Sequence, residues 1–142
     1  MQNKHKIITI LALSTAIFTG ILVATISTSD ETVKQANKAM YKYFSSIEAK
    51  NKEGILDVIK DTRRGNSKEI IQQSLENVKG FKGTILNSEE INNNKVIVTI
   101  EMIMDGMDKY NVIDVPVVYE DGKWLVVLEE EPKQRFDLER KK

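Results

Sequence analysis

The longest hydrophobic pattern in the chain is an uncharged run over residues 7–27. As a helix, these 21 residues reach about 30 Å, roughly the thickness of the hydrocarbon core of a bilayer. Charges flank the run, basic before it and acidic after it: Lys4, Lys6, Asp30 and Glu31. Because positive flanking residues favour the cytoplasm, we expect a cytoplasmic stub over residues 1–6 and an extracytoplasmic domain from residue 30 onwards.

This run has two interpretations, an uncleaved membrane anchor or a cleaved signal segment. Signal peptides usually have a shorter apolar stretch of about 7–15 residues, which ends in small residues. The candidate small pairs are Thr25 with Ser27 and Ser27 with Ser29, and neither is an alanine pair. We therefore favour a single-pass anchor in the cell membrane, whereas cleavage makes the domain secreted. A bacterial lipoprotein anchor is excluded because the chain has no cysteine to acylate.

Helical periodicity follows, beginning at a capping box formed by Thr28 and Glu31. It predicts a helix over residues 30–49, a short second helix after Asn51 and a third helix after Asn66. The apolar stripes of the three helices are Val33, Ala36, Met40, Tyr43, Phe44 and Ile47, then Ile55, Leu56 and Ile59, then Ile70, Ile71, Leu75 and Val78.

From Phe81 the hydrophobic period changes to two, which is typical of strands with one solvent-facing side. Four strands are predicted, over about residues 82–90, 95–104, 111–119 and 123–129. The pattern does not define the register of the first of these strands.

Two loops predict the register of the last three strands. The dipeptide Asp121-Gly122 is a strong signal for a two-residue hairpin turn. It predicts the pairs Tyr119 with Trp124, Val117 with Val126 and Val115 with Leu128. A four-residue loop over residues 106–109 likewise predicts the pairs Ile100 with Val115 and Met102 with Ile113. Both loops bring the apolar positions to the same face of the sheet.

Three helices followed by a four-stranded antiparallel meander predict an α+β fold, with the helices on one face of a curved sheet. The segment FSSIEAKNKEGILDVIKD (residues 44–61) and the strand end YEDGKWLV (residues 119–126) resemble the nuclear-transport-factor-two-like, or cystatin-like, superfamily. The resemblance covers residues 30–130 and leaves residues 131–142 as a charged tail. It implies a cone with an internal pocket. It also implies functions that range from isomerases and dehydratases to ligand-binding modules and scaffold domains of secretion machines.

Composition excludes several classes of chemistry. The 21 basic and 21 acidic residues give no net charge, and the outer domain is slightly acidic without Lys4 and Lys6, so a nucleic-acid partner is not expected. The only histidine is His5, and there is no cysteine. Ser-His-Asp and Cys-His catalysis and the usual zinc sites are therefore excluded from the outer domain. We expect no cofactor, and the lack of cysteine suits an exported protein of a Gram-positive bacterium.

The resemblance also implies where a ligand or a substrate would bind. For a catalytic member of the superfamily, the resemblance implies acidic or basic side chains that transfer protons inside an apolar cone. The predicted inner faces of the last three strands contain no acid or base, so an acid would have to come from Glu89, Glu90 or the helices. The candidates for a ligand pocket are Tyr43, Met102, Tyr119 and Trp124.

The outer sheet face has a different feature. In the predicted register Glu101 lies opposite Asp114, and Asp114 lies opposite Glu129. Three carboxylates in a row suggest a cation site or a docking surface for a basic partner, since directly opposed like charges destabilise a sheet. The alternative is a solvated face on which each acid turns away or meets a lysine, and we favour this alternative.

These observations favour a non-enzymatic, membrane-tethered domain that acts by binding. Its partner is either an envelope protein or a small apolar ligand in the cone. Two alternatives stay open, an isomerase- or dehydratase-type enzyme and a bitopic subunit of a secretion or conjugation machine. A homodimer through the outer sheet face is a further expectation, because apolar residues mix with charges there. These apolar residues are Ile97, Ile103, Val112, Val118, Leu125 and Val127.

Overall fold

The structure is a computed structural model that describes residues 30–108, 110–131 and 133–134 of the 142-residue chain. The predicted membrane segment over residues 7–27 lies outside the described residues. The chain divides into two compact units, Met1–Glu31 and Thr32–Lys142, and the second unit contains the sheet. None of the helices in the described ranges combines the length and apolar character needed to cross a membrane.

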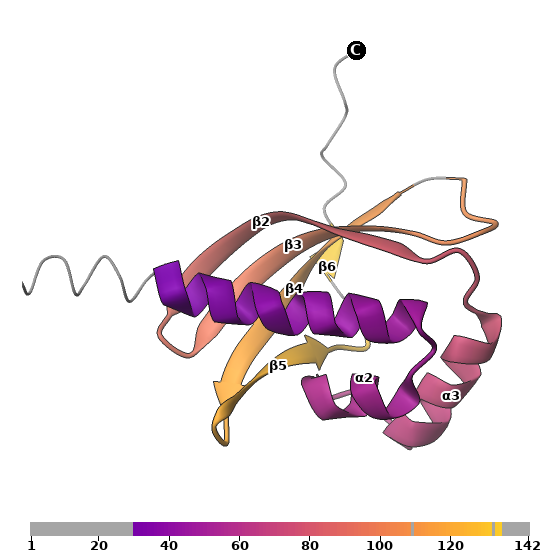
Figure 1. Cartoon of the computed structure of the whole chain (residues 1–142), viewed down its shortest axis with the longest axis horizontal. Helices are drawn as coiled ribbons and strands as arrows, with labels where there is room; N and C mark the ends of the chain where they lie inside the picture. The colour runs from indigo at the N-terminus through magenta and orange to yellow at the C-terminus, as the bar shows by residue number, and fades with distance from the viewer. Residues whose placement is uncertain (1–29, 109, 132, 135–142) are drawn as a thin grey trace, which may run out of the picture. The chain divides into compact units, whose positions relative to one another are not determined.

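Three helices precede the long strands, as the periodicity predicts (Figure 1). The first covers residues 30–48 and is called the long helix below. The second, α2, is Lys52–Val58, and the third, α3, is Ser67–Asn77. Both predicted caps are confirmed, because Asn51 and Asn66 accept hydrogen bonds from backbone N–H groups of the first turn of α2 and α3.

The sheet has more strands than the four that the sequence predicts. Its strands are β1 (Ile59–Asp61), β2 (Lys82–Asn92), β3 (Lys95–Ile103), β4 (Asn111–Glu120), β5 (Lys123–Leu128) and β6 (Lys133–Gln134). Their order is β1-β5-β4-β3-β2, with β6 pairing with β4. All pairs are antiparallel except β1 with β5. The short strands β1 and β6 are additions to the predicted meander.

The predicted second helix is too long at its carboxyl end. It ends at Val58, and Ile59 begins β1 instead of extending the helical stripe. Ile59 pairs in parallel with Val126, which is fully buried. Burial against a central strand thus determines the conformation of this β-branched residue.

The hairpin between β4 and β5 is confirmed at its turn and wrong at its far end. Tyr119 pairs with Trp124 and Val117 with Val126, as the Asp-Gly turn predicts. The predicted pair of Val115 with Leu128 does not form, because pairing between β4 and β5 ends at Val117 and Val126. Beyond Val117, β6 takes the place of β5 beside β4.

The register between β3 and β4 differs from the prediction by two residues. Ile100 pairs with Ile113 and Val98 with Val115. The last pair before the connection is Met102 with Asn111, so the connection is longer than the predicted four-residue loop. Because side chains alternate with a period of two, this shift leaves every residue on its predicted face. The continuous apolar face is therefore confirmed, although the individual partners are wrong.

β2 is an edge strand with two bulges. The register with β3 slips by one residue between Ile85 and Asn87 and again between Glu90 and Asn92. Leu86 and Ile91 are the extra residues, and both are exposed. Each bulge exchanges the faces of the residues that follow it, which is why simple alternation does not define this register.

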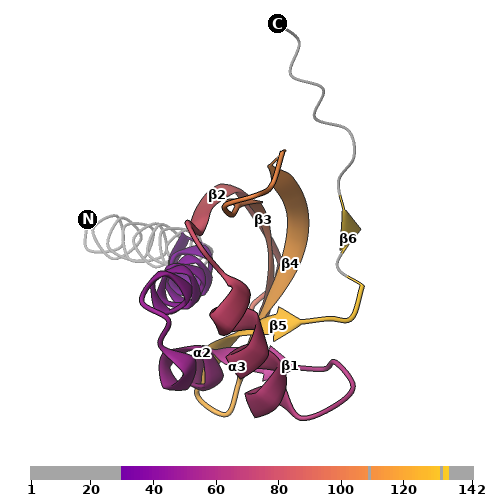
Figure 2. The same ribbon diagram turned by 90° about the vertical axis from the view of Figure 1, so that its right-hand side faces the viewer.

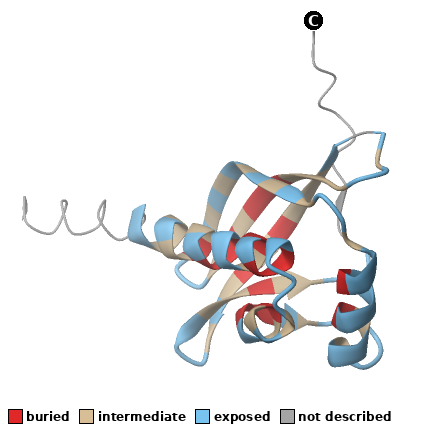
Figure 3. Cartoon of the chain, turned by 45° about the vertical axis from the view of Figure 1, so that its right-hand side comes forward, coloured by how far each residue is buried: buried red, intermediate tan, exposed pale blue. Residues whose placement is uncertain are grey.

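The helices lie on the concave side of the sheet (Figure 2). Buried residues gather on the sides of the helices and strands that face each other (Figure 3). The helices contribute Met40, Phe44, Ile47, Ile55, Ile71 and Leu75 to the core, and the sheet contributes Val96, Val98, Ile100, Val115, Val117 and Val126. Burial of these side chains contributes roughly 1.5–3 kcal/mol each and drives the helices onto the sheet.

We expect Gly83→Ala to destabilise the domain. A Cβ atom at Gly83 would lie 2.8 Å from the ring of Phe44, which is buried and unable to move aside cheaply. Overpacking of this kind typically costs about 1–3 kcal/mol of unfolding free energy. Urea denaturation followed by circular dichroism measures the loss, with Thr84→Ala at the neighbouring exposed position as the control. An unchanged midpoint for Gly83→Ala would contradict the packing of the long helix on β2.

Candidate functional site

Two cavities adjoin each other on the helix side of the sheet. The larger, about 210 Å³, lies among the long helix, α2, α3 and β3, and is called the helix-side cavity. The smaller, about 130 Å³, lies between β4 and β5 and is called the seam cavity. Four residues line both cavities: Tyr43, Arg63, Met102 and Leu128.

The seam cavity forms where β5 separates from β4. Pairing between these strands ends at Val117 and Val126, and β5 then continues along β1. The lining includes Val115 from the concave face and also Asp114 and Pro116, which alternate with it on the opposite face. The cavity therefore borders both faces of the sheet and lies beside the helix-side cavity.

The main polar feature of the site is an ion pair between Asp61 and Arg63. Arg63 donates from Nε to Oδ1 at 2.8 Å and from Nη2 to Oδ2 at 2.7 Å, and its backbone N–H donates to Oδ1 at 3.1 Å. The Asp61 side chain is only 4% exposed, and that of Arg63 is 24% exposed. The hydrogen bonds from Arg63 hold the pKa of Asp61 below its usual value, and those to Asp61 raise the pKa of Arg63.

Tyr43 adds a hydroxyl to the wall of both cavities. It lies on the long helix and packs partly buried against the core. Burial raises the pKa of Tyr43, while the nearby Arg63 charge acts in the opposite direction. Within the part of the chain that the structure describes, the hydroxyl makes no hydrogen bond. A neutral hydroxyl and a guanidinium thus border an otherwise largely apolar space.

The four residues predicted to line a ligand pocket lie at two separate sites. Tyr43 and Met102 line the cavities. Tyr119 and Trp124 form an aromatic pair with ring centroids 5.5 Å apart, and they line a separate groove beside the long helix and α2. Sequence reasoning did not find the ion pair of Asp61 with Arg63, because the short strand that carries Asp61 has no periodic signal.

The candidate catalytic acids Glu89 and Glu90 lie outside both cavities. Glu89 is exposed on β2, and Glu90 occupies a position opposite Val96. Neither residue lines the helix-side cavity or the seam cavity. Two acids of the outer-face row, Asp114 and Glu129, line the seam cavity, and Asp61 holds Arg63, which lines both cavities.

The predicted opposition of three carboxylates on the outer face is wrong. Glu101 pairs with Val112, and Asp114 pairs with Thr99, whose hydroxyl donates to Asp114 Oδ1 at 2.7 Å. Glu129 lies beyond the last pair of β4 with β5. The two-residue shift of register and the separation of β5 from β4 together remove the row. In the described ranges, no three acidic or histidine side chains come close enough to hold a metal ion.

Comparison with solved structures identifies the fold. A structure of an NTF-2-like protein of unknown function from Silicibacter pomeroyi is 10% identical, with 75% of this chain and 98% of that chain covered at a TM-score of 0.53. A domain of unknown function with a cystatin-like fold from Nostoc punctiforme is 16% identical, with coverages of 79% and 81% and a TM-score of 0.52. The nuclear-transport-factor-two-like, cystatin-like α+β fold is therefore confirmed.

These likenesses concern the fold alone. A hexachlorocyclohexane dehydrochlorinase also matches at 12% identity, covering 78% of this chain and 90% of that chain, but its TM-score of 0.38 carries no argument about activity. No protein-family model and no curated protein matches the chain. The function must therefore be inferred from the chemistry of the site.

We expect the ion pair of Asp61 with Arg63 to make stability depend on pH. The folded pKa of Asp61 is lowered, so its contribution is present above the unfolded value of about 3.9 and is lost as the pH falls through the folded value. Asp61→Asn should lower the unfolding free energy by about 1–3 kcal/mol near neutral pH. Below about pH 5, the unfolding free energy of this variant should decrease less steeply than that of the unaltered chain.

Urea denaturation at several pH values between about 7 and 3 measures this effect. Asp108→Asn, at an exposed position in the loop before β4, is the matched control and should leave both the stability and its pH dependence unchanged. An Asp61→Asn variant with the same pH profile as the unaltered chain would contradict the assignment.

Proposed function

We propose that the domain is a binding module that takes one small, largely apolar molecule into the helix-side cavity. The observation that carries this proposal is the guanidinium of Arg63, held by Asp61, at the wall of an otherwise largely apolar space. Ligand sites typically combine apolar walls with a few fixed polar groups in this way. The volume of about 210 Å³ suits a single ring, since a cavity of about 150 Å³ accommodates benzene in another protein.

The polar groups favour a ligand that carries a hydrogen-bond acceptor. A guanidinium has five N–H donors, and Asp61 uses only part of them. Both Arg63 and Tyr43 line the same space. Ser74 also lines it, but its hydroxyl already donates to the carbonyl of Ile70 at 2.8 Å. A carboxylate or carbonyl group on the ligand would therefore meet donors.

The same geometry supports binding over catalysis. A general base needs a pKa near the working pH. Both oxygens of Asp61 accept hydrogen bonds from Arg63, and its pKa is lowered. The described residues that line the helix-side cavity include no acid. An isomerase- or dehydratase-type reaction would have no evident proton acceptor there.

We also propose that residues 7–27 anchor this module in the cell membrane, with the domain on the outer side. The support is the length of the uncharged run and the basic residues that precede it. In this arrangement the module would meet its ligand or a protein partner in the envelope.

Benzoate should raise the melting temperature of the full chain by several degrees when it is present at about ten times its Kd, a stabilisation of about 1.4 kcal/mol. Benzylamine, of similar size and opposite charge, should not raise it.

Arg63→Gln should remove the shift in melting temperature with benzoate because it removes the guanidinium. Val78→Phe should also remove it by filling the helix-side cavity, whereas Leu86→Phe at an exposed position should not. Equal shifts with both compounds, or a shift that persists in Val78→Phe, would overturn the proposed site.

The absence of cysteine permits a direct test of the membrane topology. Lys68→Cys, at an exposed position in α3, should react with a membrane-impermeant maleimide in intact cells. Lys4→Cys should react only after the cells are permeabilised, and its recovery in the membrane fraction would show that the segment is not cleaved. Labelling of Lys4→Cys alone in intact cells would reverse the proposed orientation.

A further inference from the structure

A separate groove of about 930 Å³ runs between the long helix, α2 and the turn that joins β4 to β5. Among the described residues, none that lines this groove also lines the helix-side cavity or the seam cavity. Three lysines line it, Lys38 and Lys42 from the long helix and Lys123 from the hairpin. We call it the lysine groove.

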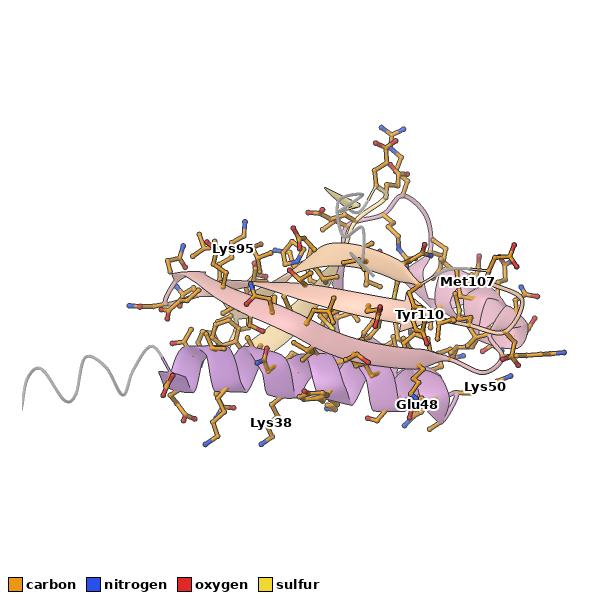
Figure 4. All side chains as sticks on the ribbon, turned by 90° about the horizontal axis from the view of Figure 1, so that it is seen from above. Lys38, Glu48, Lys50, Lys95, Met107 and Tyr110 are labelled. Carbon is orange, nitrogen blue, oxygen red and sulfur yellow. The ribbon has the colours of Figure 1, made fainter. Side chains whose placement is uncertain are left out.

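The lysine groove has an excess of positive charge. Among the described residues that line it, Asp57 is the only acid. It pairs with Lys42 at 2.5 Å and with Lys123 at 3.6 Å, so one carboxylate is shared by two ammonium groups. Lys38 forms no ion pair with any described residue, and it projects away from the sheet (Figure 4). A local excess of this kind, in a chain with no net charge, indicates an anionic partner.

Exposed aromatic rings lie beside these lysines. Tyr41 is 57% exposed and Tyr119 is 43% exposed, and Trp124 packs against Tyr119. Large aromatic side chains left partly accessible are enriched at sites of protein recognition. The combination therefore favours a partner that offers apolar groups as well as negative charges.

The spacing of the charges favours an extended chain. Lys38 and Lys42 are one helical turn apart, which separates them by about 6 Å along the axis. Alternate side chains of an extended peptide are about 6.6–6.8 Å apart on the same side. Acidic residues at alternate positions can thus meet both lysines, while the residues between them face the opposite side.

We propose that the lysine groove binds an extended acidic segment of a partner protein. Its acidic residues pair with Lys38, Lys42 and Lys123. The intervening apolar residues contact the rings of Tyr119 and Trp124. Asp57 keeps the ammonium groups of Lys42 and Lys123 in place before the partner binds. The partner is thus recognised by alternating acidic and apolar residues.

The test uses the full chain in a neutral detergent and a fluorescein-labelled peptide of alternating glutamate and valine, followed by fluorescence anisotropy. A peptide of alternating lysine and valine is the control for charge. The acidic peptide should bind, with an affinity that falls as salt is added, and the basic peptide should not. Lys38→Glu and Lys123→Glu should each weaken binding by about tenfold. Lys68→Glu makes the same charge change on α3, outside the groove, and should have little effect.

A second pair of variants separates the aromatic contact from general charge attraction. Tyr119→Ala should weaken binding several-fold, whereas Tyr110→Ala, at a similarly exposed position outside the groove, should not. Equal binding of both peptides, or equal effects of Lys38→Glu and Lys68→Glu, would overturn the proposal.

Binding to phosphatidylglycerol vesicles is measured as a separate test. Lysine-dependent binding to these vesicles without binding to the acidic peptide would assign the groove to lipid headgroups instead.

Discussion

The parallel pairing of β1 with β5 is the constraint on which the site depends. Pairing of β5 with β4 ends at Val126, whereas pairing with β1 continues to Leu128, and the seam cavity forms where β5 separates from β4. Asp61 lies at the end of β1, and its carboxylate holds the guanidinium of Arg63, two residues further along the chain. A guanidinium beside an apolar cavity is costly unless a carboxylate compensates it. Asp61 supplies this compensation for Arg63, which lines both cavities.

The sequence correctly predicts the structural features that depend on alternating apolar residues and on a tight hairpin turn. The apolar face of the sheet follows from a period of two, which survives a register shift of two residues. The pairs nearest the Asp121-Gly122 turn follow from the length of that turn. A strand of three residues such as β1 has no period to detect, and the bulges at Leu86 and Ile91 interrupt the pattern of β2. Tertiary contacts determine these elements, so local patterns do not reveal them.

The same distinction applies to the candidate site. The apolar stripe of the first helix and the inner face of the strand over residues 95–104 predict Tyr43 and Met102 as pocket residues, and both line the cavities. Tyr119 shares a sheet face with this region but lies near the turn of the β4–β5 hairpin, where it borders the lysine groove. A shared face does not imply proximity along a strand of ten residues. The contribution of Arg63 depends on Asp61 and on the parallel strand, neither of which has a sequence signature.

The two bulges of β2 have a consequence for how the molecule behaves at high concentration. An edge strand of eleven residues offers unpaired backbone groups on which strands of other molecules can add. The extra residues Leu86 and Ile91 interrupt the regular spacing of these groups and twist the edge. They thereby oppose growth of the sheet from one molecule to the next, which protects the protein against aggregation through its one long free edge among the described strands.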